Sequence, residues 1–476
     1  MAHRDRYGGT APPGGRVARA PGLVSALAVL AAVGLSGCAP PLEPGGLRLA
    51  HAPNWQTPLS GNPRTMDNRL WWQGLKDPVL DAVIARALSG SPTLAAARAR
   101  SAAAEQTIAT VPGGLRVNGG LEGTRENASD TPARTSLRAD LGLEWLFDPG
   151  GARAAQRQGA VARAALARAE ADAAQLLLTA EIAESYLALR HAQARLALTH
   201  AEARRLRHAL ALARQLADAG EGTELEITRA QARLATLETR LPALEAAPAR
   251  EILRLGVLAG DAPGTLPEAL LRSLRTGAAQ PQPRLLPDPR VPAELLRNRP
   301  DLRLAEARYD SARADLGEAR AALYPRLSLS GVIEARQVAT PGSSTQTVLT
   351  SVGPTLRLPA LPQTSTRAGI SAAETRLRAA HADWEAAALN ALFEVETALA
   401  DYGATSRAET AASRAQGLHA RARDLQARSV EAGEGTLADL LAVEADLSAA
   451  QSAAADARLE RARAFVTLNL RLGSGG

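Results

Sequence analysis

Two carboxylates with the same neighbours recur 213 residues apart in this sequence. Glu226 lies three residues after the Thr of an Ala-Gly-Glu-Gly-Thr stretch at 219–223, and Asp439 lies three residues after the Thr of an identical stretch at 432–436. A Thr followed three residues later by an acidic residue is the pattern of a capping box, which satisfies free N–H groups at the start of a helix. The pattern therefore predicts a helix after each stretch, with Glu226 or Asp439 in its first turn.

The glycines of the repeated stretch are the candidate turn residues. A helix commonly ends at a residue with a positive φ angle, and glycine adopts such an angle without strain. We therefore expect each stretch to join two antiparallel helices. The expected turn residues are Gly220 and Gly222 in the first stretch, and Gly433 and Gly435 in the second.

The only cysteine, Cys38, is a candidate for covalent modification. Basic residues up to Arg19 precede an apolar run at 23–35, which is typical of an export signal and too short to span a membrane. Cys38 follows Leu-Ser-Gly and resembles the Cys of a bacterial lipobox, where the peptidase cuts before the Cys and the thiol receives diacylglycerol. The alternative is an ordinary signal peptide with a chance Cys. Ala39 at the next position favours sorting of the lipoprotein to the outer membrane.

The other reactive residue types form no catalytic pattern. The seven histidines are scattered, and no His-x-x-x-His pair or Cys cluster has the spacing of a metal site. No Gly-rich loop precedes a Lys-Ser or Lys-Thr pair, so the sequence does not support nucleotide binding. We interpret the chain as not an enzyme, with no metal and no cofactor other than the covalent lipid on Cys38.

Composition and charge indicate long helices and argue against a nucleic-acid partner. Aromatic residues make up only 3% of the chain, and much of its 46% apolar content is alanine, the best helix former. Four arginines and one aspartate in residues 1–37 account for +3 of the formal charge of +6. The remaining basic residues are scattered without interleaved aromatic residues, so we interpret them as solvated helix faces.

The sequences on either side of the two stretches indicate that the whole chain is duplicated. In each half, a helical stretch leads to two extended runs joined by turn residues, which predicts a β-hairpin, and a long helix follows. Pro112 and Pro325, which precede the first strand of each half, are also 213 residues apart. We expect strands at 115–126, 135–147, 324–336 and 347–358, and long helices that end at Ala219 and Glu431.

This duplication divides the chain into five segments. The first two are a lipoprotein signal peptide at 1–37 and an acylated N-terminal tether at 38–76. The first repeat spans 77–260 and the second spans 291–476, with a linker at 261–290 between them.

Apolar residues after each Ala-Gly-Glu-Gly-Thr stretch follow a regular spacing of three and four. This spacing is the signature of helices that wind around each other. Helices of about 65 residues would span roughly 100 Å, far longer than a compact domain needs. The heptad positions are Ile227, Ala230, Leu234, Leu237, Leu241 and Leu244 in the first half, and Leu440, Val443, Leu447, Ala450, Ala454 and Ala457 in the second.

Four strands per chain cannot close a barrel, because about eight are needed even for a packed interior. Open strand edges promote aggregation in water and do not occur in lipid. We therefore expect three copies to supply twelve strands, with the long helices forming a second wall. The expected fold class is mainly α with a membrane β-barrel portion, located in the outer membrane and extending into the periplasm.

Several motifs resemble those of the outer-membrane efflux lipoproteins of the NodT/OprM type, relatives of TolC that serve RND-type pumps. The resemblance covers nearly everything after the signal peptide, and the Arg-Pro-Asp-Leu to Tyr-Pro-Arg-Leu-Ser-Leu-Ser-Gly block is its most specific part. It implies a homotrimer with a twelve-stranded barrel and a helical tube, a periplasmic adaptor protein and an inner-membrane proton-driven transporter as partners. The motifs lie at 68–80, 240–245, 291–308, 317–331 and 432–447.

The resemblance also gives the two carboxylates a possible role in the channel. It places Glu226 and Asp439 near the periplasmic tip, where the family constricts its channel with carboxylates. Three copies would bring six acidic side chains into a ring that attracts cations. Ala442 stands where relatives often carry a further carboxylate, so the constriction is expected to be weaker. Helix capping alone is the alternative interpretation of both residues.

The resemblance implies that the chain is a subunit of a passive exit duct for drugs or other small molecules. Two other functions compete with this interpretation. One is the exit duct of a type I secretion system driven by an ABC transporter. The other is a periplasmic coiled-coil adaptor lipoprotein that conducts nothing, which explains the helices and the anchor but not the two hairpins. The sequence does not identify the transported substrates.

Overall fold

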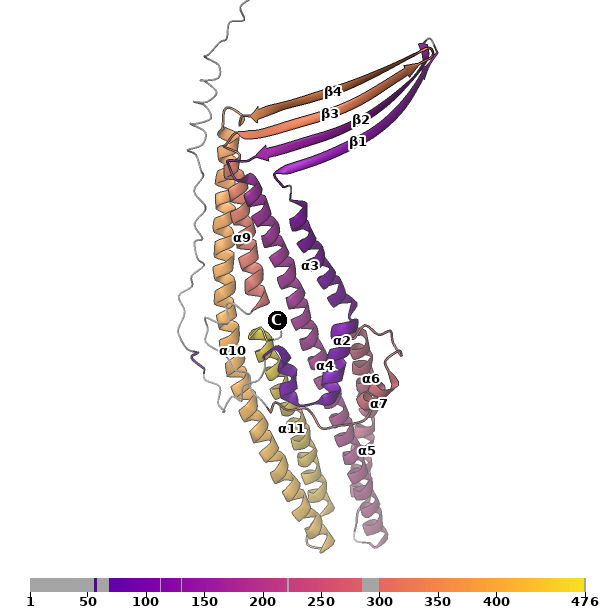
Figure 1. Cartoon of the computed structure of the whole chain (residues 1–476). Helices are drawn as coiled ribbons and strands as arrows, with labels where there is room; N and C mark the ends of the chain where they lie inside the picture. Colours follow the sequence, from indigo (N-terminus) through magenta and orange to yellow (C-terminus); the bar gives the residue numbers. More distant parts are fainter. Residues whose placement is uncertain are drawn as a thin grey trace, which may run out of the picture. The chain divides into compact units, whose positions relative to one another are not determined.

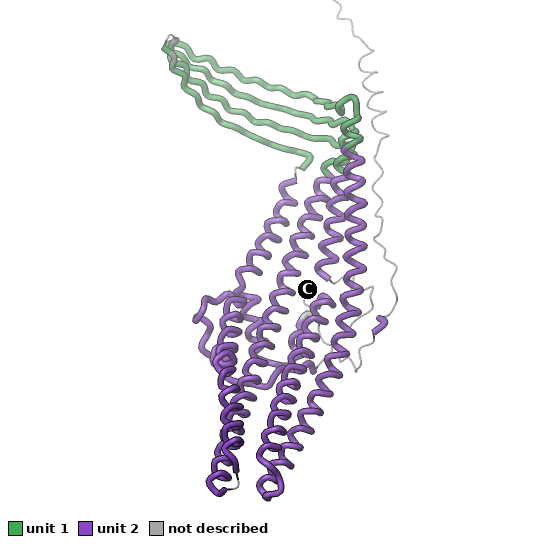
Figure 2. The backbone as a smooth tube through the Cα atoms, turned by 180° about the vertical axis from the view of Figure 1, so that it is seen from behind, with its two compact units in different colours: residues 1–44, 112–153, 317–368 green, residues 45–111, 154–316, 369–476 purple. Residues whose placement is uncertain are grey.

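The computed structural model describes residues 55–57, 68–111, 113–129, 131–220, 222–284 and 299–474. Cys38, the signal peptide at 1–37 and most of the tether lie outside the described residues. The chain divides into two compact units, coloured in Figure 2. The described part of the first unit contains the four strands, and the second contains most of the helical length.

The helical unit is built around two very long helices, α4 (Ala152–Asp218) and α10 (Thr364–Glu431) (Figure 1). They contain 67 and 68 residues, which corresponds to about 100 Å each. Each is followed by a short turn and a returning helix, α5 (Glu224–Glu238) or α11 (Leu437–Arg471). The predicted helix–turn–helix hairpins are confirmed, and their turns lie at the same end of the helical unit.

The returning helix of the first half is interrupted, unlike its counterpart in the second half. Helix α5 ends before Thr239, and α6 (Leu241–Leu258) begins with Pro242 in its first turn. Pro242 has no N–H to donate to the preceding turn, so the helical hydrogen bonds are interrupted there, although Thr239 and Arg240 keep helical backbone angles. The heptad positions expected through Leu241 and Leu244 thus lie on two consecutive helices in the first half, whereas α11 is continuous.

Five shorter helical elements complete the described part of the helical unit. The predicted break near Gly90 is confirmed, because Ser91 separates two of them. The segment predicted as a linker, 261–290, contains one of these helices. No helix in the described ranges is both long enough and apolar enough to cross a membrane. The elements are η1 (Asn68–Leu75), α2 (Pro78–Gly90), α3 (Pro92–Thr110), α7 (Glu268–Arg275) and α9 (Pro300–Ala321).

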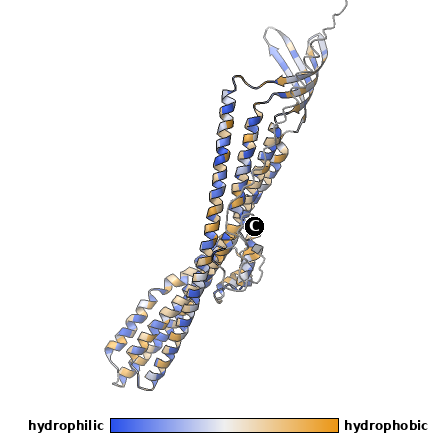
Figure 3. Ribbon diagram, turned by 90° about the vertical axis from the view of Figure 1, so that its left-hand side faces the viewer, coloured by the Kyte–Doolittle hydropathy of each residue, from blue (hydrophilic) through white to orange (hydrophobic). Residues whose placement is uncertain are grey.

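Large side chains are concentrated in one core cluster of the helical unit. Trp71 and Trp72 of η1 pack edge to face, with ring centroids 6.0 Å apart, and Trp71 is 6.3 Å from the ring of Phe465. Tyr186 and Tyr402 belong to the same buried cluster. Elsewhere apolar and polar residues alternate along the helices, as Figure 3 shows. Aromatic residues are therefore scarce because most of the helical length forms two-helix contacts, which alanine packs well. The large side chains gather in the cluster around Trp71.

The other unit contains one antiparallel sheet in the order β1-β2-β3-β4 (Figure 1). Both predicted hairpins are confirmed, with strands somewhat longer than expected at their turn ends. Gly342 has a φ of +89° in the turn between β3 and β4, where a side chain would be strained. Pairing of β2 with β3 joins the two halves of the chain. The strands are β1 (Leu115–Ala128), β2 (Thr131–Phe147), β3 (Arg326–Thr340) and β4 (Ser343–Arg357).

The register of the sheet separates apolar from polar residues. Successive side chains of a strand point to opposite faces, so paired residues share a face. Leu121, Leu141 and Ile333 lie on one face, which is rich in large apolar side chains, and they are 81%, 54% and 51% exposed. The other face carries most of the charged residues of the strands. The sheet thus presents an apolar surface that no described part of its own unit covers.

Candidate functional site

The first hairpin tip uses its two glycines for different reasons. Gly220 has a φ of +80°, and its N–H donates to the Ala217 carbonyl at 3.0 Å. Gly222 does not have a positive φ, but its N–H donates to the Leu216 carbonyl at 3.0 Å. A Cβ at Gly222 would lie 2.7 Å from the Ala217 nitrogen, inside van der Waals contact. Gly220 therefore sets the backbone angle, and Gly222 permits close approach of the chain to the end of α4.

The second tip repeats this arrangement. Gly433 has a φ of +77°, and a Cβ at Gly435 would lie 3.0 Å from the Ser429 hydroxyl oxygen and 3.1 Å from the Val430 nitrogen. The Glu434 and Gly435 N–H groups both donate to the Ser429 carbonyl, at 2.9 and 3.1 Å. The sequence-based argument from positive φ explains Gly433, whereas the role of Gly435 depends on contacts that only the folded turn reveals.

Glu226 and Asp439 both bind the threonine that precedes their helix. The Glu226 carboxylate accepts the Thr223 N–H at 3.0 Å, and the Glu226 N–H donates to the Thr223 hydroxyl oxygen at 3.3 Å. Asp439 donates its N–H to the Thr436 hydroxyl oxygen at 3.1 Å, and its carboxylate accepts the Thr436 hydroxyl at 2.7 Å. The first tip thus has a complete capping box, and the second has the threonine cap with a shorter acidic side chain.

The two hairpins are joined above their tips by Glu444 of α11. Its carboxylate accepts Nε of Arg205 on α4 at 2.5 Å, and its other oxygen is 3.7 Å from Nε of Arg423 on α10. The Ser448 hydroxyl donates to Glu202 of α4 at 2.6 Å. These contacts link helices from both halves of the chain next to an apolar cluster that contains Leu206, Ala213, Ala230, Leu437 and Leu441.

The sequence pattern did not identify this connection. Glu444 follows the heptad residue Val443 directly, which indicates only that its side chain lies at the edge of a helix contact. Arg205 is 239 residues away along the chain. A heptad pattern shows which face of a helix is buried, but it does not show which other helix covers that face.

The Arg-Pro-Asp-Leu motif forms an ion-pair network around the buried guanidinium of Arg299, in which the Asp301 side chain is half exposed. The guanidinium of Arg299 donates to Asp301 at 3.0 and 2.7 Å, to Glu394 at 2.6 Å and to the Arg471 carbonyl at 2.8 Å. Burial opposes the charge of Arg299, but its hydrogen bonds to the two carboxylates raise its pKa above the usual value. The motif therefore connects the start of α9 to α10 and to the end of α11.

A second buried arginine, Arg190 of α4, connects this helix to the end of α7 through hydrogen bonds. Arg190 is 1% exposed and donates to the Tyr186 hydroxyl oxygen at 2.9 Å and to the Thr276 carbonyl at 2.7 Å. The Tyr186 hydroxyl donates to Asp77 at 2.8 Å, so the charge of Arg190 is linked to a carboxylate through one phenol. Burial is the main cause that raises the pKa of Tyr186, which keeps the phenol protonated as a donor.

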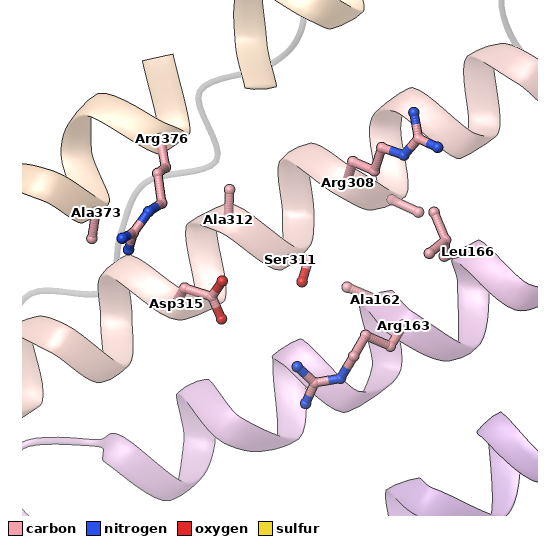
Figure 4. Close-up of a pocket in the computed structure, with 10 residues that line it drawn as sticks. Ala162, Arg163, Leu166, Arg308, Ser311, Ala312, Asp315, Ala373 and Arg376 are labelled. Atoms are coloured by element: carbon pink, nitrogen blue, oxygen red, sulfur yellow. The ribbon is translucent and has the colours of Figure 1, made fainter. Parts of the chain in front are cut away.

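A groove between α4, α9 and α10 shows no catalytic arrangement. It has a volume of about 210 Å³ and a floor of small residues that includes Ala162 and Ala373. Arg163 and Arg376 reach from α4 and α10 toward Asp315 of α9 without forming an ion pair (Figure 4). In the described part of the chain, no three His, Cys, Asp or Glu residues come together as metal ligands.

Comparison with known proteins identifies one family along most of the chain. A sequence profile of the outer membrane efflux protein family matches residues 83–261 and 291–474. Nodulation protein T of Rhizobium leguminosarum bv. trifolii is 30% identical over 418 residues, covering 85% of this chain and 87% of that protein. The pyoverdine export outer membrane protein OpmQ of Pseudomonas aeruginosa is 31% identical over 474 residues, covering 95% and 96%. The solved structure of the outer-membrane channel OprN superposes with a TM-score of 0.74 at 29% identity, covering 90% of this chain and 98% of that one.

Proposed function

The chain belongs to the outer membrane efflux protein family, and from this premise we propose that three copies form a passive exit duct that an inner-membrane pump supplies. The chain is an efflux channel subunit of the outer membrane that extends into the periplasm. The sequence-based predictions of family, fold class, function and location are confirmed. We further propose that it catalyses no reaction, because the pump supplies the energy for transport.

The proposed trimer is supported mainly by the sheet, which has unpaired edges and one apolar and one polar face. Within the described unit, β1 and β4 each pair on one side only, which leaves a row of backbone N–H and C=O groups without strand partners. Such edges must be closed before a sheet can enter lipid. Joining β1 of one copy to β4 of the next closes twelve strands from three copies, with the apolar face outward and the polar face around a channel.

The proposed partners are a periplasmic adaptor protein and an RND-type transporter. The names of two relatives associate OpmQ of Pseudomonas aeruginosa with pyoverdine export and FusA of Burkholderia cepacia with resistance to fusaric acid. The two names refer to chemically different small molecules, although both proteins are similar in sequence to this chain. We therefore propose that this duct carries small molecules that its pump has selected.

Purification and reconstitution of the full-length chain test this function. A heat-modifiable trimer on a denaturing gel and discrete conductance steps in a planar bilayer are the expected results. A monomer without conductance would favour the non-conducting adaptor lipoprotein. Deletion of the gene is expected to raise accumulation of a pump-substrate dye in cells. Loss of a secreted protein with unchanged dye accumulation would instead support the type I secretion duct.

Lipid attachment at Cys38 is a separate prediction, because that residue lies outside the described part of the structure. Cys38→Ser removes the only thiol of the chain, so no other cysteine can accept the lipid. We expect the wild-type chain to incorporate labelled palmitate and the Ser variant to incorporate none. Labelling of the variant would contradict the lipobox interpretation.

A further inference from the structure

Two arginines face each other at the end of the sheet that leads into the helices. Arg326 is the first residue of β3, Arg357 is the last residue of β4, and the two are Cα partners. Like charges directly opposite on neighbouring strands are destabilising. Both side chains are exposed, and neither forms an ion pair or side-chain hydrogen bond with another described residue. Asp148, which follows β2, accepts the Arg153 N–H at 2.7 Å instead.

The register places both arginines on the polar face of the sheet. Arg326 shares its face with Glu334, eight residues along β3, whereas Leu327 and Ile333 lie on the apolar face. In the proposed trimer the polar face surrounds the channel, because the apolar face must contact lipid. The two guanidinium groups therefore project into the lumen at the strand ends that continue into α9 and α10.

The charges in the middle of the sheet differ from this pair because they compensate one another. Arg138 lies 3.1 Å from the Glu334 carboxylate and 3.8 Å from the Asp140 carboxylate. Glu334 is about 26 Å from Arg326 along the strand, at about 3.3 Å per residue. This separation exceeds the Debye length of about 8 Å at physiological ionic strength, so Glu334 does not neutralise the arginine pair.

Glu144 of β2 pairs with Ser330, about 13 Å from Arg326 along β3, and is itself paired with Arg116 of β1. Asp148 follows the Phe147–Leu327 pair and supplies one negative charge against the two arginines, so this end of the polar face keeps a net positive charge.

We propose that Arg326 and Arg357 form a basic ring of six guanidinium groups at the helix-side mouth of the barrel, which selects for anions and binds polyvalent anions in transit. The proposal rests on the proposed trimer, because each chain contributes only two of the six groups. A ring of positive side chains attracts anions and raises the barrier for cations. Paired guanidinium groups also bind phosphate or carboxylate oxygens well, because their N–H groups match the geometry of these anions. The ring is thus a specificity-determining element separate from the hairpin tips.

The test measures reversal potential in planar bilayers under a KCl gradient, with pyrophosphate as a blocking probe. Arg326→Gln combined with Arg357→Gln is expected to shift the reversal potential toward the cation value and to abolish pyrophosphate block. Each single variant is expected to give an intermediate shift of the reversal potential. The single variants still test the proposal if the double variant does not assemble. The shift should be smaller in 1 M than in 0.1 M salt, because screening shortens the reach of the ring.

Arg125→Gln is the matched control, because Arg125 pairs with Thr135 on the opposite face of the sheet. It removes one positive charge per chain and is expected to leave reversal potential and block unchanged. Equal shifts in the control and the ring variants, or no shift in the ring variants, would overturn the proposal. If the wild-type chain forms no conducting trimer, the proposed function itself fails and the ring fails with it; conducting trimers with unaltered selectivity overturn the ring alone.

Discussion

At the scale of single residues, the Arg299–Asp301 pair makes the stability of the helical unit depend on pH. Burial opposes ionisation of Asp301, but hydrogen bonds from Arg299 hold its pKa below the usual value. A carboxylate with a lowered folded pKa stabilises the fold above its unfolded pKa of about 3.9, and this contribution is lost as the pH falls through the folded value. The pair is therefore expected to contribute at neutral pH and to fail under strongly acidic conditions.

The variant Asp301→Asn tests this pH dependence. At pH 7 we expect a lower unfolding temperature than in the wild type, since the buried Arg299 loses a charged partner. The difference should shrink as the pH falls from about 4 through the lowered folded pKa, because the unfolded chain takes up a proton first and the folded carboxylate is neutralised only at lower pH. Circular dichroism melts between pH 2.5 and 7 measure this convergence. A difference that stays constant across the series would show that ionisation of Asp301 does not contribute.

The capping contacts show how far single-residue prediction extends. Thr223 with Glu226, and Thr436 with Asp439, are local pairs three residues apart, so the sequence pattern alone identified them. The positive-φ argument applies to Gly220 and Gly433, and it gives no reason for the second glycine of each tip. Gly222 is required by its distance to Ala217, and such a close approach is a property of the folded turn rather than of the residue type.

At the scale of elements, the contact of Glu444 with Arg205 and Arg423 is one of the polar links between the two hairpins. All three side chains are at least partly buried, with the Glu444 side chain 13% exposed. Removing one partner leaves the remaining charges poorly solvated. Glu444→Gln is expected to lower the stability of this contact by about 2 kcal/mol, the typical value for a hydrogen bond to a charged group.

Hydrogen exchange of the amides of α11 around Glu444 measures this loss. Faster exchange is expected near the hairpin tip in Glu444→Gln, with little change at the far end of α11. Asp446→Asn is the matched control, because Asp446 lies two residues away on the same helix, is exposed and forms no ion pair with a described residue. Equal acceleration in both variants would mean that Glu444 does not hold the hairpins together.

Periodicity in the sequence predicted the type of most elements but not their joints. The alternation of apolar residues identified both β-hairpins, and the heptad spacing identified the paired helices, because both patterns are set by local backbone geometry. The heptad pattern continues across Pro242, where the hydrogen bonding between α5 and α6 is interrupted although the backbone angles of Thr239 and Arg240 stay helical. Likewise α7 was assigned to a linker, although Leu274 is fully buried against the main core. Such packing depends on contacts between segments that lie far apart in the chain.

At the scale of the whole molecule, the proposed function depends on groups that only the proposed trimer would bring together. One chain supplies a four-stranded sheet with two unpaired edges, two tip carboxylates and the two arginines of the proposed ring, none of which acts as a pore by itself. The tips belong to the helical unit and the arginines to the sheet unit. The acidic ring predicted at the tips and the basic ring proposed in the barrel have opposite signs, so their effects on ion selectivity can be distinguished.

Neutral variants of the tip carboxylates separate an aperture from a helix cap. Glu226→Gln removes the charge but keeps an oxygen that can accept the Thr223 N–H, since a capping box accepts Glu or Gln. Combined with Asp439→Asn, it is expected to raise single-channel conductance and reduce cation preference, because six negative charges leave a narrow ring. Adding the arginine variants should shift selectivity in the opposite direction and nearly additively, as expected for sites without shared partners. Unchanged conductance and selectivity in the tip variant would leave Glu226 and Asp439 as helix caps only.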